Sequence, residues 1–255
     1  MTKFQTNQFL INDEVNQHLQ NIINSKLFAT GYIFSGADGL GKKETALLFI
    51  RGIFQQYSSS KNINERIINN NHPDLLVVEP TSFNKFTSTR NPEFEKPTKK
   101  NAEIIKIEQI RNIKTFLIQK SIESKKKVVL ILNAHLLNEA ASNCLLKTLE
   151  EPSNGIFILL TSKLNALLDT ITSRCQLVRF KSSSRKQIDN FLENNLDSDK
   201  LDTYKKLNYQ DLVNLGNGSP RLILSNIEIW EEISEEIKFK LEIPLKDKIE
   251  ILKVC

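Results

Sequence analysis

The sequence predicts an α/β fold in which a parallel sheet carries a phosphate-binding loop. Five short apolar runs alternate with helix-like segments along the chain. The second run, residues 75–78, is apolar without interruption, which is typical of a strand covered on both faces in a parallel sheet. The first run leads into a glycine-rich turn that opens a helix, as phosphate loops do. The expected strands are 32–35, 75–78, 128–132, 156–160 and 177–180.

Helical segments are expected before and between these strands because their apolar residues recur every three or four positions. Asn138 is placed to cap the helix before the fourth strand, and Pro152 is placed to end it. Lys125, Lys126 and Lys127 precede the third strand and are expected to form its solvated entry. The long helices expected are Asp13 to Ser25, Glu44 to Gln56, Ile104 to Ile118 and Glu139 to Glu151.

The composition changes after the fifth strand and predicts a second, helical domain. Residues 1–180 form the α/β domain, and residues 181–227 are expected to form a small helical lid. Residues 228–255 end within a helical pattern, so we expect the start of a truncated helical collar or tail. Within the first domain, the polar insertion 81–101 is expected to be a mobile surface loop, with contact to DNA or a partner left open.

The overall composition is that of a globular protein of the cytoplasm. Of 255 residues, 40% are hydrophobic and 25% charged, and no apolar run approaches the ~20 residues of a membrane span. The first residues lack the apolar core of a signal peptide. Cys144, Cys175 and Cys255 show no paired spacing, so we expect neither disulfides nor a metal site. The net charge of +5 permits nucleic-acid contact without indicating it.

Residues 36–43 match the phosphate-loop pattern G-x-x-x-x-G-K-[ST] at every defined position except the last. The glycines let backbone N–H groups surround a phosphate, and the lysine reaches its outer oxygens. Here Lys43 replaces the hydroxyl residue that holds magnesium. Thr45 lies about 200° around the helix from Lys43 and should face away. The nucleotide-binding positions expected on this loop are Gly36, Gly39, Gly41, Lys42 and Lys43.

The third strand lacks the acidic residues that a magnesium-dependent ATPase needs at its end. In phosphate-loop ATPases, this strand delivers an Asp for magnesium and often a neighbouring Glu for the attacking water. Here it delivers Asn133, which is neutral, and Ala134, which cannot act as a base. His135 is expected to make a structural hydrogen bond. Losing metal ligands and base together predicts a site that does not hydrolyse ATP.

Two motifs make the chain resemble the AAA+ subunits of the bacterial clamp loader. Residues 145–152, Leu-Leu-Lys-Thr-Leu-Glu-Glu-Pro, are followed after a strand by Ser-Arg-Cys at 173–175. His-Pro-Asp at 72–74 and Ile-Glu-Gln-Ile-Arg at 107–111 support the same match. The degraded magnesium site points to the delta prime branch of this family rather than to the ATP-hydrolysing gamma/tau branch. The resemblance therefore implies an AAA+ phosphate-loop domain followed by a helical lid.

The resemblance also implies roles, partners and ligands. Arg174 corresponds to an arginine finger that reaches a neighbouring subunit's ATP site, Thr161 to the first sensor and Arg221 to the second. The implied partners are the gamma/tau and delta subunits, the sliding clamp and, through the complex, primed DNA. No cofactor is required, and only weak, magnesium-free binding of ATP, ADP or phosphate is expected. The chain would thus act in DNA replication as part of a polymerase holoenzyme without being an ATPase itself.

Two other readings stay open from the residues alone. The chain could be an active AAA+ ATPase, gamma/tau-like or a helicase loader, with an atypical magnesium site. A phosphate-loop kinase for a small molecule is a third possibility, but it would need acidic magnesium ligands and an acceptor pocket. An ATPase assay on the isolated chain separates the first two readings.

Overall fold

The computed structural model describes residues 13–57, 62–82, 103–151 and 155–182, together with Glu193 and Ile223. Its Cα positions group into two units, residues 1–181 and 182–255, and the sheet belongs to the first. Pro152, most of the 81–101 insertion and nearly all of the predicted lid and tail, residues 181–255, lie outside the described residues. No helix within the described ranges is both long and apolar enough to cross a membrane.

A five-stranded parallel sheet forms the centre of the first unit and confirms the predicted α/β class. The strands lie in the order β2-β5-β6-β1-β7, so β1 is flanked by the two strands that come last in the chain. Each predicted strand begins and ends within one residue of an observed one. The observed strands are β1 (Gly31–Ser35), β2 (Leu75–Val78), β5 (Lys127–Ile131), β6 (Gly155–Thr161) and β7 (Gln176–Arg179).

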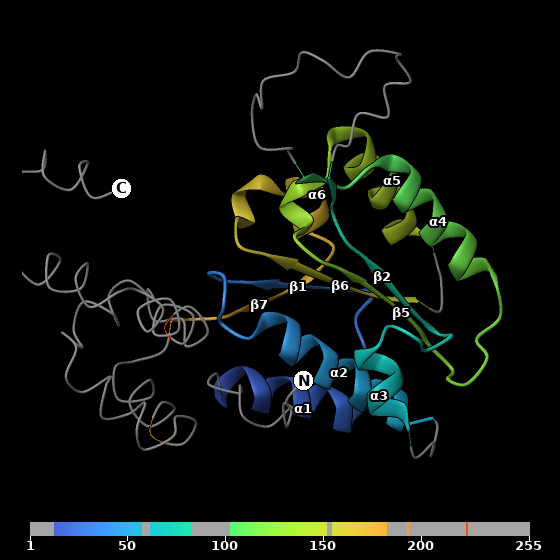
Figure 1. The fold of residues 1–255 in the computed structure, drawn as a ribbon, viewed down its shortest axis with the longest axis vertical. Helices are drawn as coiled ribbons and strands as arrows, with labels where there is room; N and C mark the ends of the chain where they lie inside the picture. The colour runs from blue at the N-terminus through green and yellow to red at the C-terminus, as the bar shows by residue number, and fades with distance from the viewer. Residues whose placement is uncertain are drawn as a thin grey trace, which may run out of the picture. The chain divides into compact units, whose positions relative to one another are not determined.

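Helices cover both faces of the sheet, as Figure 1 shows. Three of them pack on one face: α1 (Asp13–Ser25), α2 (Lys42–Gln55) and α3 (Ile63–Ile68). The other face is covered by α4 (Ile107–Ile118), α5 (Glu139–Glu150), α6 (Asp169–Thr172) and the single turns η2 (Ala134–Leu136) and η3 (Leu164–Ala166).

The alternation of side chains along each strand divides the core into two layers. Tyr32 and Phe34 of β1 face the α1–α3 layer, whereas Ile33 between them faces the α4–α6 layer. All three side chains are completely buried. Phe49 of α2 meets the rings of Tyr32 and Phe34, with centroids 5.1 and 6.3 Å away. The unbroken apolar runs of the sequence are therefore explained by burial on both faces.

Three details differ from the sequence expectations. Before α4, the chain forms a small antiparallel pair of strands, β3 (Thr81–Ser82) and β4 (Glu103–Ile104). Helix α4 therefore begins at Ile107 rather than at Ile104. Helix α2 begins at Lys42, two residues before the predicted start. Lys127 is not solvated: it is 3% exposed, its amine donates to the Phe116 carbonyl, and it lies over the Phe116 ring.

The parallel arrangement brings the carboxyl ends of β1, β5 and β6 to one edge of the sheet. Ser35 at the end of β1 lies opposite Thr161 at the end of β6, and the Gly36 N–H donates to the Thr161 carbonyl at 3.2 Å. Crevices at this edge, where neighbouring strands lead in different directions, are the usual ligand sites of open α/β sheets.

Candidate functional site: a degenerate phosphate loop

The phosphate loop joins β1 to α2 and has the backbone that its glycines predict. Gly39 and Gly41 adopt left-handed φ angles of 78° and 76°, which side chains with a Cβ rarely take. Gly36 is needed for a different reason, since a Cβ there would lie 2.6 Å from the Phe180 carbonyl oxygen. Gly41 is the N-cap of α2, so the loop leads directly into the N-terminus of a 14-residue helix, where free backbone N–H groups favour an anion.

Lys42 is folded back into this loop. Its amine donates to the carbonyl oxygens of Gly36 and Ala37, both at 2.6 Å, and lies 3.5 Å from the Asp38 carboxylate. Only 8% of the residue is exposed. Burial lowers the pKa of Lys42, while the nearby Asp38 opposes that shift. The cation that should meet the outer phosphates therefore already has acceptors within its own loop.

Lys43 occupies the position at which a hydroxyl would bind magnesium. Its side chain is half exposed, and its amine lies 3.9 Å from a carboxylate oxygen of Glu79, just past the end of β2. Thr45 is no substitute, since its buried side chain lines a hollow between α1 and α2 together with Leu19 and Phe49. An ammonium–carboxylate pair thus stands where a metal ligand is expected.

The end of β5 supplies no carboxylate to the site. Asn133 takes a left-handed conformation with φ 50°, which turns the chain into η2. Ala134 is completely buried in the α4–α6 core layer. Among the residues that the structure describes, no group of three or more His, Cys, Asp or Glu side chains is arranged to hold a metal ion.

Thr161 and His135 meet beside the phosphate loop. The Thr161 hydroxyl is buried, accepts from the Lys163 N–H at 3.1 Å and lies 3.4 Å from the His135 Nδ1. Burial lowers the pKa of His135; Asp38 opposes this, while Lys163 and Lys42 add to it. His135 therefore remains neutral near pH 7 and takes the structural hydrogen bond expected of it, although the turn at Asn133, rather than an extended strand, places it there.

Arg174 lies apart from the loop, two residues after α6. Its side chain is 40% exposed and is held by two acceptors of its own chain, the Glu150 carboxylate at 2.6 Å and the Thr170 carbonyl at 3.0 Å. The structure thus brings Lys42, Lys43 and Thr161 to one edge of the sheet and leaves Arg174 separate. Arg221 lies outside the described residues.

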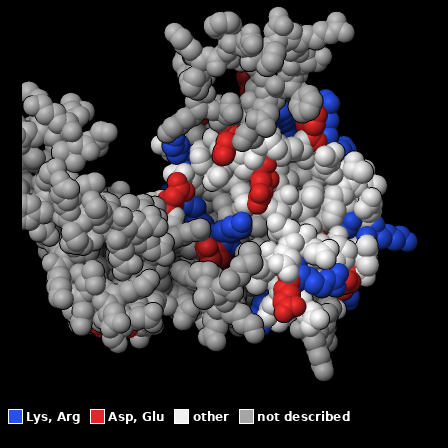
Figure 2. Space-filling model, in the orientation of Figure 1, with Lys and Arg blue, Asp and Glu red and all other residues white. Residues whose placement is uncertain are grey.

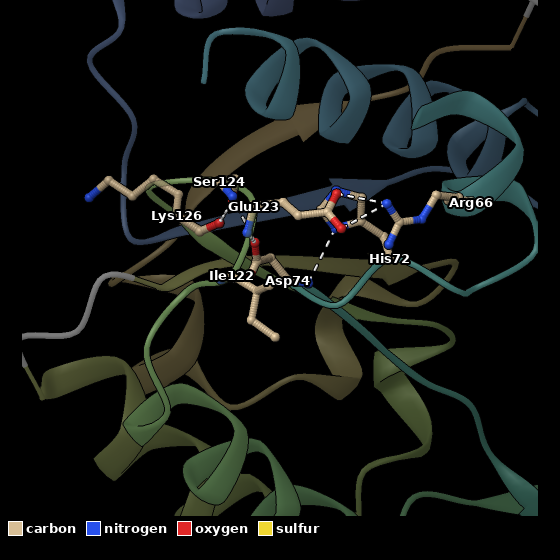
Figure 3. Close-up of polar contacts among 7 residues, drawn as sticks. All are labelled: Arg66, His72, Asp74, Ile122, Glu123, Ser124 and Lys126. Atoms are coloured by element: carbon tan, nitrogen blue, oxygen red, sulfur yellow. Dashed lines mark hydrogen bonds and ion pairs between the residues drawn. The ribbon is translucent and has the colours of Figure 1, made fainter. Parts of the chain in front are cut away.

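The His-Pro-Asp segment before β2 forms a second polar cluster (Figure 3). The Asp74 carboxylate accepts three backbone N–H groups, from Ile122, Glu123 and Ser124, each at 2.8 Å. Glu123 in turn pairs with Arg66 at 2.8 Å and approaches the buried ring of His72 at 3.6 Å. Sequence reasoning used this segment only for the family resemblance and missed its structural role.

The pKa values in this cluster follow from the contacts. Burial alone would raise the pKa of Asp74, but its three backbone hydrogen bonds outweigh burial and lower it. His72 is stacked on Phe54 with ring centroids 4.2 Å apart, and burial lowers its pKa despite the attraction of Glu123. Asp74 therefore ties the loop before β5 to the start of β2 through hydrogen bonds that favour its charged form.

Charge is mixed on the face drawn in Figure 2. Lys and Arg side chains alternate there with Asp and Glu across the described residues, so the described part of that face carries no uniformly basic area. Extended basic areas are the usual signature of direct nucleic-acid binding. The net charge of +5 is therefore not concentrated on this view of the first unit.

Comparison with known proteins gives consistent matches. A family model described as DNA polymerase III, delta subunit, matches residues 11–184. DNA polymerase III subunit delta' of Bacillus subtilis is 32% identical over 181 residues, covering 68% of this chain and 49% of that protein. Subunit tau of the same species is 28% identical over 196 residues, covering 74% of this chain and 31% of its own length.

The structural comparison supports the fold alone. A variant of RuvB from Thermotoga maritima superposes with a TM-score of 0.51 at 14% identity, covering 89% of this chain and 63% of that one. The chain spans about half the length of the delta' relative, so the match concerns the shared part.

Proposed function

The chain belongs to the DNA polymerase III delta-subunit family, and from this premise we propose that it is a delta prime-like subunit of the clamp loader that does not hydrolyse ATP. Its similarity to both a delta' and a tau subunit supports a place among the AAA+ subunits of that complex. The choice of the delta prime role depends on the chemistry of the loop.

The observation that carries this proposal is the coincidence of three changes at one site. Lys43 stands in place of the magnesium-binding hydroxyl, Asn133 in place of the metal carboxylate and Ala134 in place of the base. Phosphoryl transfer depends almost entirely on positioning and on neutralising charge, chiefly through the metal. A site with an additional ammonium and no metal carboxylate cannot supply that chemistry.

Nucleotide binding, where it occurs, is expected to be weak and independent of magnesium. A phosphate would have to displace the Gly36 and Ala37 carbonyls from Lys42, and it would meet Asp38 nearby. Lys43 would supply positive charge in place of the metal, at the cost of its contact with Glu79. We therefore propose that no cofactor is needed for function.

The active contribution of the chain is Arg174, offered to the ATP site of a neighbouring gamma/tau subunit. A guanidinium stays charged at any physiological pH and can donate two hydrogen bonds to a phosphate. Its 40% exposure at the end of α6 supports such a role. The remaining partners we propose are the delta subunit, the sliding clamp and primed DNA bound by the assembled loader.

Reconstitution with the cognate gamma/tau and delta subunits tests this proposal. Arg174→Ala should assemble normally but lose most of the DNA- and clamp-stimulated ATP turnover, because an arginine finger accelerates the neighbouring site that it enters by about 10³-fold or more. Arg179→Ala is the matched control, since it removes the same charge from the exposed side of the next strand. Unchanged turnover by Arg174→Ala in a complex shown to be intact by gel filtration would refute the trans role.

A further inference from the structure

We propose that Glu150 is a positioning residue that holds Arg174 ready for the partner's ATP site. The inference rests on the proposed function, because it concerns how the same arginine is presented. The carboxylate of Glu150, the last residue of α5, lies 2.6 Å from one terminal nitrogen of Arg174. The other terminal nitrogen donates to the Thr170 carbonyl at 3.0 Å.

These two acceptors fix the plane of the guanidinium while leaving it able to bind phosphate. An arginine has five N–H donors, so two internal contacts leave most of them available. A free arginine side chain samples many rotamers, and a geometry fixed in advance removes this freedom before the partner arrives. The finger is therefore ordered by its own chain rather than by the neighbouring site.

The supporting carboxylate comes from a helix that is packed into the core. Leu145 and Leu149 of α5 are buried in the same core layer as Ile171 of α6. Glu150 is the last residue of α5, and Arg174 lies in the turn between α6 and β7. The salt bridge therefore joins this turn to the end of α5 and gives the guanidinium a defined direction.

The placement of Glu150 is unfavourable for the helix itself. A carboxylate at a helix C-terminus meets the negative end of the helix dipole. The pair also adds little to folding stability, because Arg174 is 40% and Glu150 47% exposed and solvent weakens the attraction between exposed charges. Neither helix stability nor fold stability accounts for this carboxylate, whereas orientation of Arg174 does.

The next residue provides a matched control. Glu151 follows the same helix end and pairs with Lys114 of α4 at 2.8 Å, with its side chain 49% exposed. Removing Glu151 therefore deletes an equivalent charge and an equivalent surface pair without touching Arg174. The two adjacent glutamates differ chiefly in which cation they hold.

The experiment measures stimulated ATP turnover of the reconstituted loader with Glu150→Ala, Glu150→Gln and Glu151→Ala. Glu150→Ala should lower kcat by about two- to fivefold, the value of an exposed ion pair expressed as a rate. Glu150→Gln keeps one acceptor oxygen and should fall between that variant and wild type. KM for ATP should not change, since Arg174 acts on the transition state and not on substrate binding. Glu151→Ala should match wild type.

A double-mutant cycle decides whether Glu150 acts through Arg174. In an Arg174→Ala background, Glu150→Ala should cause no further loss, because the group that it positions is absent. An additional loss there, wild-type turnover by Glu150→Ala, or a rise in turnover would each overturn the inference. If Arg174→Ala itself leaves turnover unchanged, the proposed function fails as well. If Arg174→Ala lowers turnover and Glu150→Ala does not, only the positioning role of Glu150 fails.

Discussion

Gly31, at the start of β1, is a residue whose lack of a side chain is required by packing. A Cβ added there would lie 2.5 Å from the Sγ of Cys175 and 3.4 Å from its Cβ. We predict that Gly31→Ala lowers the free energy of unfolding by about 1–3 kcal/mol, the usual cost of overpacking a core. Urea denaturation followed by circular dichroism measures this difference.

Cys175→Ala tests whether contact with the Cys175 sulfur causes this loss of stability. Removing the sulfur opens space for the new methyl group, so the double variant should lose less stability than the two single variants added together. Strict additivity would show that the sulfur is not what the methyl group meets. Burial raises the pKa of Cys175 to about 11, so the thiol stays protonated and acts as a packing group near pH 7.

At this scale the sequence predicted where the candidate residues lie in the fold but not which side chains they pair with. Lys42, Lys43, Asn133 and Thr161 lie where the loop pattern and the strand order place them. The sequence analysis did not predict their acidic partners. Asp38 pairs with Lys42, Glu79 with Lys43, and Glu150 with Arg174. The pairs of Glu79 with Lys43 and of Glu150 with Arg174 join distant segments and depend on tertiary geometry. Asp38 is only four residues from Lys42, but the phosphate-loop pattern leaves its position undefined.

Among the elements, the start of β2 and the loop before β5 are held together by the carboxylate of Asp74. Asp74→Ala would leave three N–H groups without their acceptor, and we predict a loss of about 3 kcal/mol in the free energy of unfolding. Asp74→Asn keeps one acceptor oxygen and should lose less. Chemical denaturation at pH 7 compares the variants, and equal stability of Asp74→Ala and wild type would contradict the anchoring role.

The same carboxylate predicts a pH dependence. Hydrogen bonding holds the pKa of Asp74 below its ordinary value in the native state. Its contribution is therefore complete above the ordinary carboxyl pKa and is lost as pH falls from about 5 through that value to the native pKa. Stability measured between pH 7 and pH 2 should fall more steeply for wild type than for Asp74→Asn. Parallel curves would show that Asp74 is not the titrating group.

Runs of mainly apolar residues were enough to predict the five strands of the central sheet. Strands such as β2 and β6 were predicted within one residue for this reason. The β3–β4 pair has two residues on each side, too few to form a pattern. Lys127 was misread because the side chain of a lysine can bury its stem and end over an aromatic ring.

For the whole molecule, the decisive prediction is the absence of intrinsic ATP turnover. The isolated chain with magnesium and ATP should hydrolyse no more than a blank, because the site offers Lys43 and Asn133 to the metal. A phosphate-release assay with Lys42→Ala as the control measures this. Turnover by wild type that Lys42→Ala abolishes would refute the non-hydrolysing role, whereas turnover unaffected by Lys42→Ala indicates a contaminating enzyme.

The position of β1 in the sheet has a consequence for how the chain is made. Both of its neighbours, β6 and β7, lie more than a hundred residues later, since Gly31 pairs with Phe157 and Tyr32 with Gln176. A ribosome adds about 5–20 residues each second, so this apolar strand emerges and waits several seconds for either partner. Until β6 has left the exit tunnel, nascent chains expose the Tyr32–Phe34 segment, which makes them natural clients for chaperones that shield unpaired strands.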